Sequence, residues 1–386
     1  MHIGLLNDSF PPSVDGVAQT VKNYALALNE RPDYKVSVIA PRCRGAKDGD
    51  YPFRIHRYAA LPTPKRIGYP AGMPFSPALI RNLNNTHMDL LHVHCPFASG
   101  VLADELIRAR KVPLIHTYHT KFDVDLRVRL HTPAARAAAI QVIRHNLEAA
   151  DEVWAVTESC GKALRQVGYD GEYIVMENGT DFAYGKADTA AAEALREQYN
   201  IPSDRMVLLF VGRMMWYKNI RIILDALKIA RQKGLQFTAL MVGDGLDAPA
   251  IRAYANSLGL QGDVRFTGML LDREQLRAFY TLADLFLFPS TYDTSGLVVK
   301  EAAACECPSV LTRGSCAAEG VTDGLNGFLA NENAEDFARA VLSACEDEQA
   351  LTTVGARAGA TLYLSWDDAV KKAAARYEVV MQKWNG

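Results

Sequence analysis

Residues 285–305 read LFLFPSTYDTSGLVVKEAAAC, and this order of residue types predicts a strand, a loop and a short helix. The apolar run 285–288 is typical of a buried parallel strand, and Pro289 ends it because proline cannot donate the next ladder hydrogen bond. Residues 291–296 are turn formers, and an alanine-rich helix begins at Leu297. In an open α/β sheet, such a unit directs unpaired helical N–H groups toward the crevice beyond the strand ends, where phosphates bind.

Two carboxylates flank this predicted anion site. Asp293 lies in the loop, and Glu301 lies about one turn into the helix. Because carboxylates cannot serve as ligands of a phosphate, we interpret them as hydrogen-bond acceptors for hydroxyl groups. A nucleotide sugar offers hydroxyls at both ends of a diphosphate. The simpler alternative is a capped helix that carries two exposed acids.

The composition favours two domains and argues against nucleic acid as the main partner. A chain of 386 residues with 49% hydrophobic content can bury two cores, since domains usually span about 100–200 residues. A net charge of −2 gives no general basic field. No run approaches the roughly eighteen apolar residues of a membrane span, and residues 1–8 do not read as a signal peptide. We therefore expect a soluble cytoplasmic protein.

The cysteines give no sign of a metal site. The seven cysteines are odd in number and show no paired CxxC spacing. Reduced thiols are expected rather than disulfides or zinc.

Strands alternate with helices along the whole chain, which predicts doubly wound parallel sheets in an α/β protein. The first half should hold strands at 3–6, 36–40, 89–94, 112–115 and 153–157, with helices at 17–28 and 98–110. A polar segment then precedes a new apolar strand at Met206, so we place a domain boundary near residue 184. The second half should hold strands at 207–211, 264–268, 285–288 and 308–311, with a helix at 220–231.

Polar residues follow two strands of the first half. Gly16 precedes a helix, and its missing Cβ could let the backbone approach a diphosphate, although ordinary turn chemistry explains it equally well. Residues 11–17 are not a GxGxxG fingerprint, so nicotinamide or flavin binding loses its main support. His116, Tyr118 and His119 are costly to bury after strand 112–115, which indicates a site there unless some of them are structural.

Arg213 and Lys218 follow the first strand of the second half and precede its first helix. Two cations at this spacing suit the two phosphates of a diphosphate. Neutralising a leaving diphosphate in this way would let an enzyme dispense with a metal. A solvated surface pair is the alternative.

Together these motifs resemble the retaining family 4 glycosyltransferases, which use the two-domain glycosyltransferase B fold. The resemblance rests on the acidic pair separated by seven residues, on Gly212-Arg213 and Lys218, and on His119 at a strand end. Tyr118-His119-Thr120 is most similar to the diacylglycerol glucosyltransferase branch. The resemblance covers nearly the whole chain.

The resemblance implies two Rossmann-like domains that face each other across a cleft. Residues 1–184 would bind the acceptor, with helix 366–386 packing back on them, and residues 185–365 would bind the donor. The implied reaction moves a hexose, glucose, from UDP-glucose to an acceptor hydroxyl with retention, without a metal or cofactor. The implied catalytic residues are His119, Arg213, Lys218, Asp293 and Glu301. The implied donor-binding residues are Gly16, Gly212, Arg213, Lys218, Gly243, Gly268, Met269, Leu270, Asp293, Thr294, Ser295, Gly296, Leu297, Val298 and Glu301.

Two departures from the family pattern have physical consequences. Asp293 replaces a glutamate, and Glu306 stands where a left-handed helix end commonly has glycine. A glutamate held at positive φ would cost about 1–2 kcal/mol, so either the helix end differs or local stability is lower.

Three alternatives to this enzyme stay open at the sequence level. A nucleotide-sugar epimerase lacks this combination of Arg, Lys and acidic pair, and a phosphorylase would need a much longer chain. A sugar-nucleotide sensor without catalytic activity would be compatible with Asp293.

The acceptor is either a diacylglycerol-type lipid, a soluble compound or a polysaccharide. Lys65 and Arg66 precede the apolar residues 67–75, and Arg127, Arg129, Arg136 and Arg144 extend the basic character. Basic residues beside exposed aromatics suit an anionic membrane surface. For a lipid acceptor we expect peripheral attachment to the inner face of the cell membrane, whereas a solvated loop and helix face is the alternative.

Overall fold

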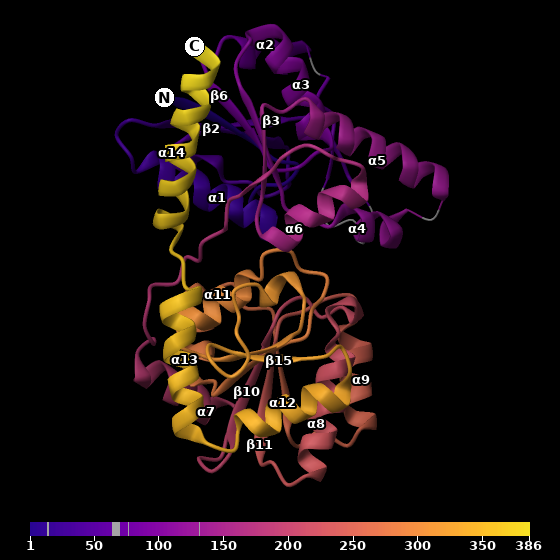
Figure 1. The fold of residues 1–386 in the computed structure, drawn as a ribbon, viewed down its shortest axis with the longest axis vertical. Coiled ribbons are helices and arrows are strands. Elements are labelled where there is room, and N and C mark those ends of the chain that lie inside the picture. The colour runs from indigo at the N-terminus through magenta and orange to yellow at the C-terminus, as the bar shows by residue number, and fades with distance from the viewer. Residues whose placement is uncertain (14, 64–69, 76, 131) are drawn as a thin grey trace. The chain divides into compact units, whose positions relative to one another are not determined.

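The computed structural model describes residues 1–386 apart from 14, 64–69, 76 and 131, and it divides into two units (Figure 1). The first unit comprises Met1–Asn178 and Trp366–Gly386, and the second comprises Gly179–Ser365. The sequence predicts that the second unit begins at residue 185, whereas in the structure it begins at Gly179. Thr180 N–H donates to the carbonyl of Leu364, and Phe182 is buried in the second core.

The first unit is built on a parallel sheet with the strand order β3-β2-β1-β6-β7-β8-β9. Its strands are β1 (His2–Leu6), β2 (Lys35–Pro41), β3 (Arg54–Tyr58), β6 (Leu90–Val93), β7 (Leu114–Tyr118), β8 (Glu152–Ala155) and β9 (Ile174–Val175). Its helices are α1 (Gly16–Asn29), α2 (Pro77–Asn84), α3 (Ala98–Arg110), α4 (Phe122–Arg129), α5 (Pro133–Glu148), α6 (Glu158–Lys162) and α14 (Trp366–Asn385). A small antiparallel pair, β4 (Ala60–Leu61) and β5 (Ala71–Gly72), lies apart from the sheet.

Helix α14 returns to the first unit, where it packs against α1. The Tyr377 ring stacks on Trp154 with 5.4 Å between the ring centroids, and the Tyr377 hydroxyl lies 2.6 Å from Nδ1 of His92. Arg376 donates to the carboxylate of Glu152, with one contact at 2.8 Å. The helix that the resemblance implies at 366–386 therefore covers buried side chains of the first sheet.

The second unit repeats the same architecture with the strand order β12-β11-β10-β13-β14-β15, all parallel. Its strands are β10 (Met206–Val211), β11 (Phe237–Val242), β12 (Val264–Gly268), β13 (Leu285–Phe288), β14 (Ser309–Thr312) and β15 (Phe328–Ala330). Its helices are α7 (Thr189–Gln198), α8 (Ile220–Gln232), α9 (Ala248–Ser257), α10 (Arg273–Leu282), α11 (Leu297–Ala304), α12 (Ala334–Ala344) and α13 (Glu348–Leu362). The prediction of two doubly wound parallel-sheet units is confirmed.

The strand order reverses between β1 and β6 in the first sheet and between β10 and β13 in the second. In open α/β sheets, ligands bind beyond the carboxyl ends of the strands at such a reversal. The fold therefore marks one position in each unit where a site is expected.

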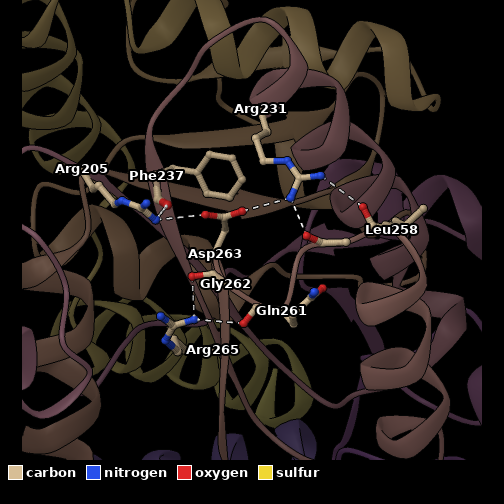
Figure 2. A network of polar contacts seen from close by, with 9 residues as sticks. Arg205, Arg231, Phe237, Leu258, Gln261, Gly262, Asp263 and Arg265 are labelled. Carbon is tan, nitrogen blue, oxygen red and sulfur yellow. Dashed lines mark hydrogen bonds and ion pairs between the residues drawn. The ribbon is translucent and has the colours of Figure 1, made fainter.

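The opposite, amino-terminal edge of the second sheet is closed by a charge cluster (Figure 2). Asp263, which precedes β12, accepts from Arg205 over 3.0 Å and from Arg231 over 3.3 Å. Arg205 also donates to the carbonyl of Phe237, the first residue of β11. Because Asp263 pairs with both arginines and Arg205 also binds the backbone, this edge of the sheet has a structural role.

Strand β7 extends further than the sequence predicts. The polar segment expected after residue 115 continues the strand to Tyr118, and both His116 and Tyr118 are fully buried. The backbone N–H of Phe122 donates to the Tyr118 hydroxyl over 3.3 Å. Tyr118 is thus a structural residue, and only His119 of the three polar rings lies beyond the strand end.

Candidate active site

Most of the predicted site residues lie at the carboxyl edge of the second sheet, around the reversal between β10 and β13. Arg213 and Lys218 follow β10, Gly243 follows β11, and Gly268 ends β12. Asp293 and the start of α11 follow β13. Neighbouring strands thus bring together residues that are far apart in sequence.

Three of the predicted glycines form one close-packed row at this edge. Gly243 N–H donates to the carbonyl of Gly268 over 2.8 Å. A Cβ on Gly243, whose φ is +131°, would lie 1.9 Å from the carbonyl oxygen of Gly212. No other residue fits there, so Gly243 is required by the approach of its own backbone to the loop that carries Arg213.

Lys218 and Asp293 form an ion pair. Lys218 Nζ lies 2.5 Å from Asp293 Oδ1, and the Ser290 hydroxyl donates to Oδ2 over 2.5 Å. Although burial alone would raise the pKa of Asp293, the contacts with Lys218 and Ser290 and the nearby charge of Arg213 lower it below its ordinary value. Asp293 is therefore ionised at neutral pH.

Asn219, at the start of α8, holds together the two loops that carry this ion pair. Its side-chain amide donates to the carbonyl of Pro289 over 3.0 Å and to Glu332 Oε1 over 2.7 Å. The Thr312 hydroxyl donates to the same carbonyl of Pro289 over 2.9 Å. Asn219 thereby ties the loop after β10 to the loop after β13, which carry the cation and the acid.

The start of α11 receives no cap from the residue that flanks it. Its first flanking residue, Gly296, has φ +54° and supplies no capping side chain. A Cβ there would lie 3.0 Å from the Cα of Ala317, which favours glycine at this position. Within the described part of the chain, the exposed Arg213 makes no side-chain hydrogen bond or ion pair. Helical N–H groups and an unpaired guanidinium together attract a phosphate.

Glu301 is a buried member of a polar network that reaches the surface. Arg273 donates to its Oε1 over 2.7 Å, and the Tyr280 hydroxyl donates to its Oε2 over 2.9 Å. Arg273 also binds Asp181, the third residue of the second unit. Burial raises the pKa of Glu301, and the charge of Arg273 opposes that rise.

The remaining predicted donor residues surround these groups. Met269 is 57% exposed and Leu270 is half-buried, so the loop after β12 is partly open to solvent. Thr294, Ser295 and Val298 are half-buried, and Leu297 is the first residue of α11.

In the first unit, His119 belongs to a cluster of buried histidines. Its Nε2 lies 2.9 Å from Nδ1 of His94, and the His94 ring is 4.0 Å from that of His92. Burial, aided by the charge of His116, lowers the pKa of His119 to about 3. At neutral pH His119 is therefore an uncharged hydrogen-bonding group.

Two helix starts at the carboxyl edge of the first sheet, those of α1 and α3 beside the strand reversal, are occupied by carboxylates. Asp15 accepts from the N–H of Ala18 over 2.8 Å at the start of α1, where Gly16 is the first residue. Asp8 accepts from the N–H groups of Ala98 and Ser99 at the start of α3. A phosphate would meet negative charge at both places, so the anion site that the structure favours is in the second unit.

No sequence pattern predicts several residues of the site. Arg273 and Tyr280 read only as the start and the buried face of a helix, and Ser290 reads as a turn residue. Their partners lie 28, 21 and 3 residues away. His94 was expected only as the end of a strand.

The basic and apolar segment proposed for membrane contact is only partly described. Lys65 and Arg66 lie outside the described residues, as does the apolar run to residue 69. Beyond it, Met73 and Phe75 are 48% and 68% exposed. Among the described residues, no helix is long and apolar enough to cross a membrane.

Comparison with protein families identifies both halves of the chain. Residues 14–184 match the model described as Glycosyltransferase Family 4, and residues 191–359 match Glycosyl transferases group 1.

Two alpha-monoglucosyldiacylglycerol synthases are similar over most of their length. That of Acholeplasma laidlawii is 24% identical over 87% of this chain and 86% of its own. That of Streptococcus pneumoniae is 26% identical over 89% and 78%. A D-inositol 3-phosphate glycosyltransferase of Geodermatophilus obscurus is 30% identical over 77% of this chain and 68% of its own.

Solved structures agree with the fold. Anabaena HepE in complex with UDP and glucose superposes with a TM-score of 0.77 at 21% identity, covering 98% of this chain and 100% of its own. Sucrose-phosphate synthase from Thermosynechococcus elongatus reaches 0.80 at 21% identity over 99% of both chains. The likeness shows the glycosyltransferase B fold.

Proposed function

The chain belongs to the family 4 glycosyltransferases, and we propose that it transfers glucose from UDP-glucose to an acceptor hydroxyl with retention of configuration. The observation that carries the proposal is the group at the carboxyl edge of the second sheet. Arg213, Lys218 and the uncapped start of α11 offer positive charge there, and Asp293 and Glu301 offer hydroxyl acceptors.

In the proposed complex, Arg213 and Lys218 hold the diphosphate. An ammonium group has three N–H donors, and Lys218 directs one of them to Asp293, so two remain for phosphate oxygens. The helical N–H groups of α11 add a field of the same sign. These groups stabilise the negative charge that develops on the leaving diphosphate.

The reaction exchanges one bond for another at the anomeric carbon. The bond from this carbon to the diphosphate oxygen breaks, and the acceptor oxygen forms its bond on the same face through an oxocarbenium-like state. The leaving phosphate takes the acceptor proton, so no protein side chain need act as covalent nucleophile or base. Asp293 would bind a sugar hydroxyl, and Glu301 would bind the ribose hydroxyls.

Methanolysis tests the donor chemistry without knowledge of the natural acceptor. We expect incubation with UDP-glucose in dilute methanol to release UDP and form methyl α-glucoside, detected by proton NMR. Lys218→Met should abolish turnover, whereas Lys233→Met, at an exposed position, is the matched control. Binding of UDP-glucose without any turnover would favour the sensor alternative, and the β-glucoside would exclude retention.

For the acceptor we propose a diacylglycerol-type lipid at an anionic membrane surface. Support comes from the two synthases that resemble the chain along most of its length, and from the exposed Met73 and Phe75. A soluble inositol phosphate is the second candidate, because the relative at 30% identity is named for that acceptor.

An assay with lipid vesicles distinguishes the two candidate acceptors. With labelled UDP-glucose, anionic vesicles containing diacylglycerol should sediment the protein at low salt, release it as salt rises, and gain label. Glycosylation of inositol 3-phosphate, with no binding to vesicles at low salt, would overturn the lipid acceptor and leave sugar transfer intact.

A further inference from the structure

Arg273 joins the Glu301 carboxylate to the segment that begins the second unit. Its guanidinium donates to Glu301 Oε1 over 2.7 Å and binds both oxygens of Asp181, one of them over 3.0 Å. The same guanidinium lies over the ring of Phe182, 4.5 Å from its centroid. A planar group held by two carboxylates and one ring has little freedom to rotate.

The network leaves Glu301 with unused acceptor capacity. Oε1 accepts from Arg273 and Oε2 accepts from Tyr280 over 2.9 Å, while a carboxylate can accept about four hydrogen bonds. Across the described ranges of the chain, Glu301 has no other side-chain partner. One acceptor position on each oxygen therefore remains, which matches two adjacent hydroxyl groups.

We propose that Arg273 is a positioning residue for the nucleotide: by fixing the Glu301 carboxylate from one side, it directs the two remaining acceptor positions at the ribose 2′ and 3′ hydroxyls. This inference rests on the proposed function, in which Glu301 receives the ribose. Arg273 touches neither the sugar nor the phosphates in this assignment and acts only through Glu301.

Charge supports the same assignment. Burial raises the pKa of Glu301, and Arg273 is the main group that opposes the rise. Without Arg273, the carboxyl group would protonate more readily and would lose acceptor positions. Asp181 and Glu301 would also face each other without the cation between them.

Lysine cannot replace Arg273 fully. The planar guanidinium donates two hydrogen bonds to Asp181 and a third to Glu301, and an ammonium group lacks this geometry. Arg273→Lys therefore keeps the charge but relaxes the orientation, whereas Arg273→Gln removes both.

The test compares the affinity for UDP with that for 2′,3′-dideoxy-UDP, measured by calorimetry on the full chain. The wild-type protein should prefer UDP by about tenfold to a hundredfold, because hydrogen bonds to a charged group are lost in the dideoxy compound. Arg273→Gln should weaken UDP binding by about tenfold and leave dideoxy-UDP binding unchanged. Arg273→Lys should give an intermediate preference and serves if Arg273→Gln does not fold. Arg277→Gln, on the same helix and bonded to the carbonyl of Gly185, is the matched control.

Each other outcome overturns the inference in a distinguishable way. If Arg273→Gln lowered the affinities for UDP and dideoxy-UDP equally, Arg273 would have a structural role only. If the variant bound UDP more tightly, Arg273 would compete with the ribose. A preference that survives Arg273→Gln but disappears in Glu301→Gln would remove Arg273 from ribose recognition while keeping Glu301. A preference that survives Glu301→Gln would remove the ribose role of Glu301 itself, and with it that part of the proposed function.

Discussion

Lys218 Nζ lies 2.5 Å from Asp293 Oδ1, so the cation expected at the diphosphate and the acid expected at the donor sugar are ion-pair partners. The side chains are 9% and 25% exposed. Each charge therefore depends on the other, and a change at one residue alters the electrostatics of both predicted subsites.

Lys218→Met should destabilise the second unit as well as stop turnover. Removing one partner of a largely buried pair leaves the other charge uncompensated, which costs about 3 kcal/mol. The double variant Lys218→Met with Asp293→Asn should recover most of that loss in urea unfolding but none of the turnover. If the double variant were no more stable than the single one, the pair would contribute nothing to folding.

Asp293→Glu should keep the fold and change donor choice or rate. The extra methylene advances the carboxylate by about 1.5 Å, the length of a C–C bond, and Asp293 is at present held by Ser290 as well as Lys218. A longer side chain must bend or give up one of these contacts. Turnover of UDP-glucose and UDP-galactose would be compared, with Glu301→Ala as the reference for weakened donor binding, and unchanged kinetics would contradict a role at the sugar.

As the pH is lowered, UDP affinity should begin to fall before the ordinary carboxyl pKa of 4.5 is reached, because the pKa of Glu301 is raised. The ionised form accepts hydroxyl groups, so affinity is present above the raised pKa and lost as pH falls through it. Stability has the opposite sign: Glu301 is most favourable to folding when protonated, and its contribution is lost as pH rises from 4.5 through the raised pKa. Calorimetry from pH 4.5 to 8 measures the first effect.

Glu301→Gln is the control for this pH series, because the diphosphate also titrates near pH 6. The variant should bind UDP weakly, with only the pH dependence of the nucleotide itself. An identical dependence in both proteins would contradict the assignment to Glu301.

Glu306→Gly should stabilise the protein by about 0.5–1 kcal/mol. Glu306 follows α11 with φ +56°, and its N–H and that of Cys307 donate to the carbonyls of Ala303 and Ala302, as in a left-handed helix end. Glu306, which stands where the family has glycine, is thus held in a strained backbone conformation. The hydrogen bond from the Tyr184 hydroxyl to Glu306 is exposed and therefore weak. Glu306→Ala, which loses that bond but keeps the strain, should not gain stability in thermal unfolding.

Transfer activity should survive chelation. The proposal meets the diphosphate charge with Arg213, Lys218 and the start of α11, and the described residues contain no group of three or more His, Cys, Asp or Glu side chains placed to hold a metal ion. Initial rates with and without excess EDTA, after gel filtration, measure this. A rate restored only by added manganese or magnesium would contradict it.

The sequence predicts the elements of this protein better than their contacts. Strand β13 and helix α3 occur with the bounds expected, because one is a short apolar run ended by proline and the other a helix-forming run between breakers. Lys218 and Asp293 were both predicted as site residues, but their pairing spans 75 positions and has no local signature.

The error at β7 has a similar cause. His116 and Tyr118 look too polar for a buried strand, yet the sheet buries polar rings and pairs some of them: His92 meets Tyr377 and Thr117 at 2.6 Å each, while Nε2 of His116 has no hydrogen-bond partner among the described residues. The contact with Tyr377 spans 285 positions. Such compensation becomes visible only when α14 is in place.

That position of α14 also fixes the order in which the protein can be completed during synthesis. Residues 1–178 leave the ribosome long before Trp366–Asn385, and the whole second unit is made between them. Until then Tyr377 cannot cover Trp154 and His92, so part of the first sheet stays uncovered until the last helix of the chain has been made. The first unit, although most of it is synthesised first, is therefore completed last.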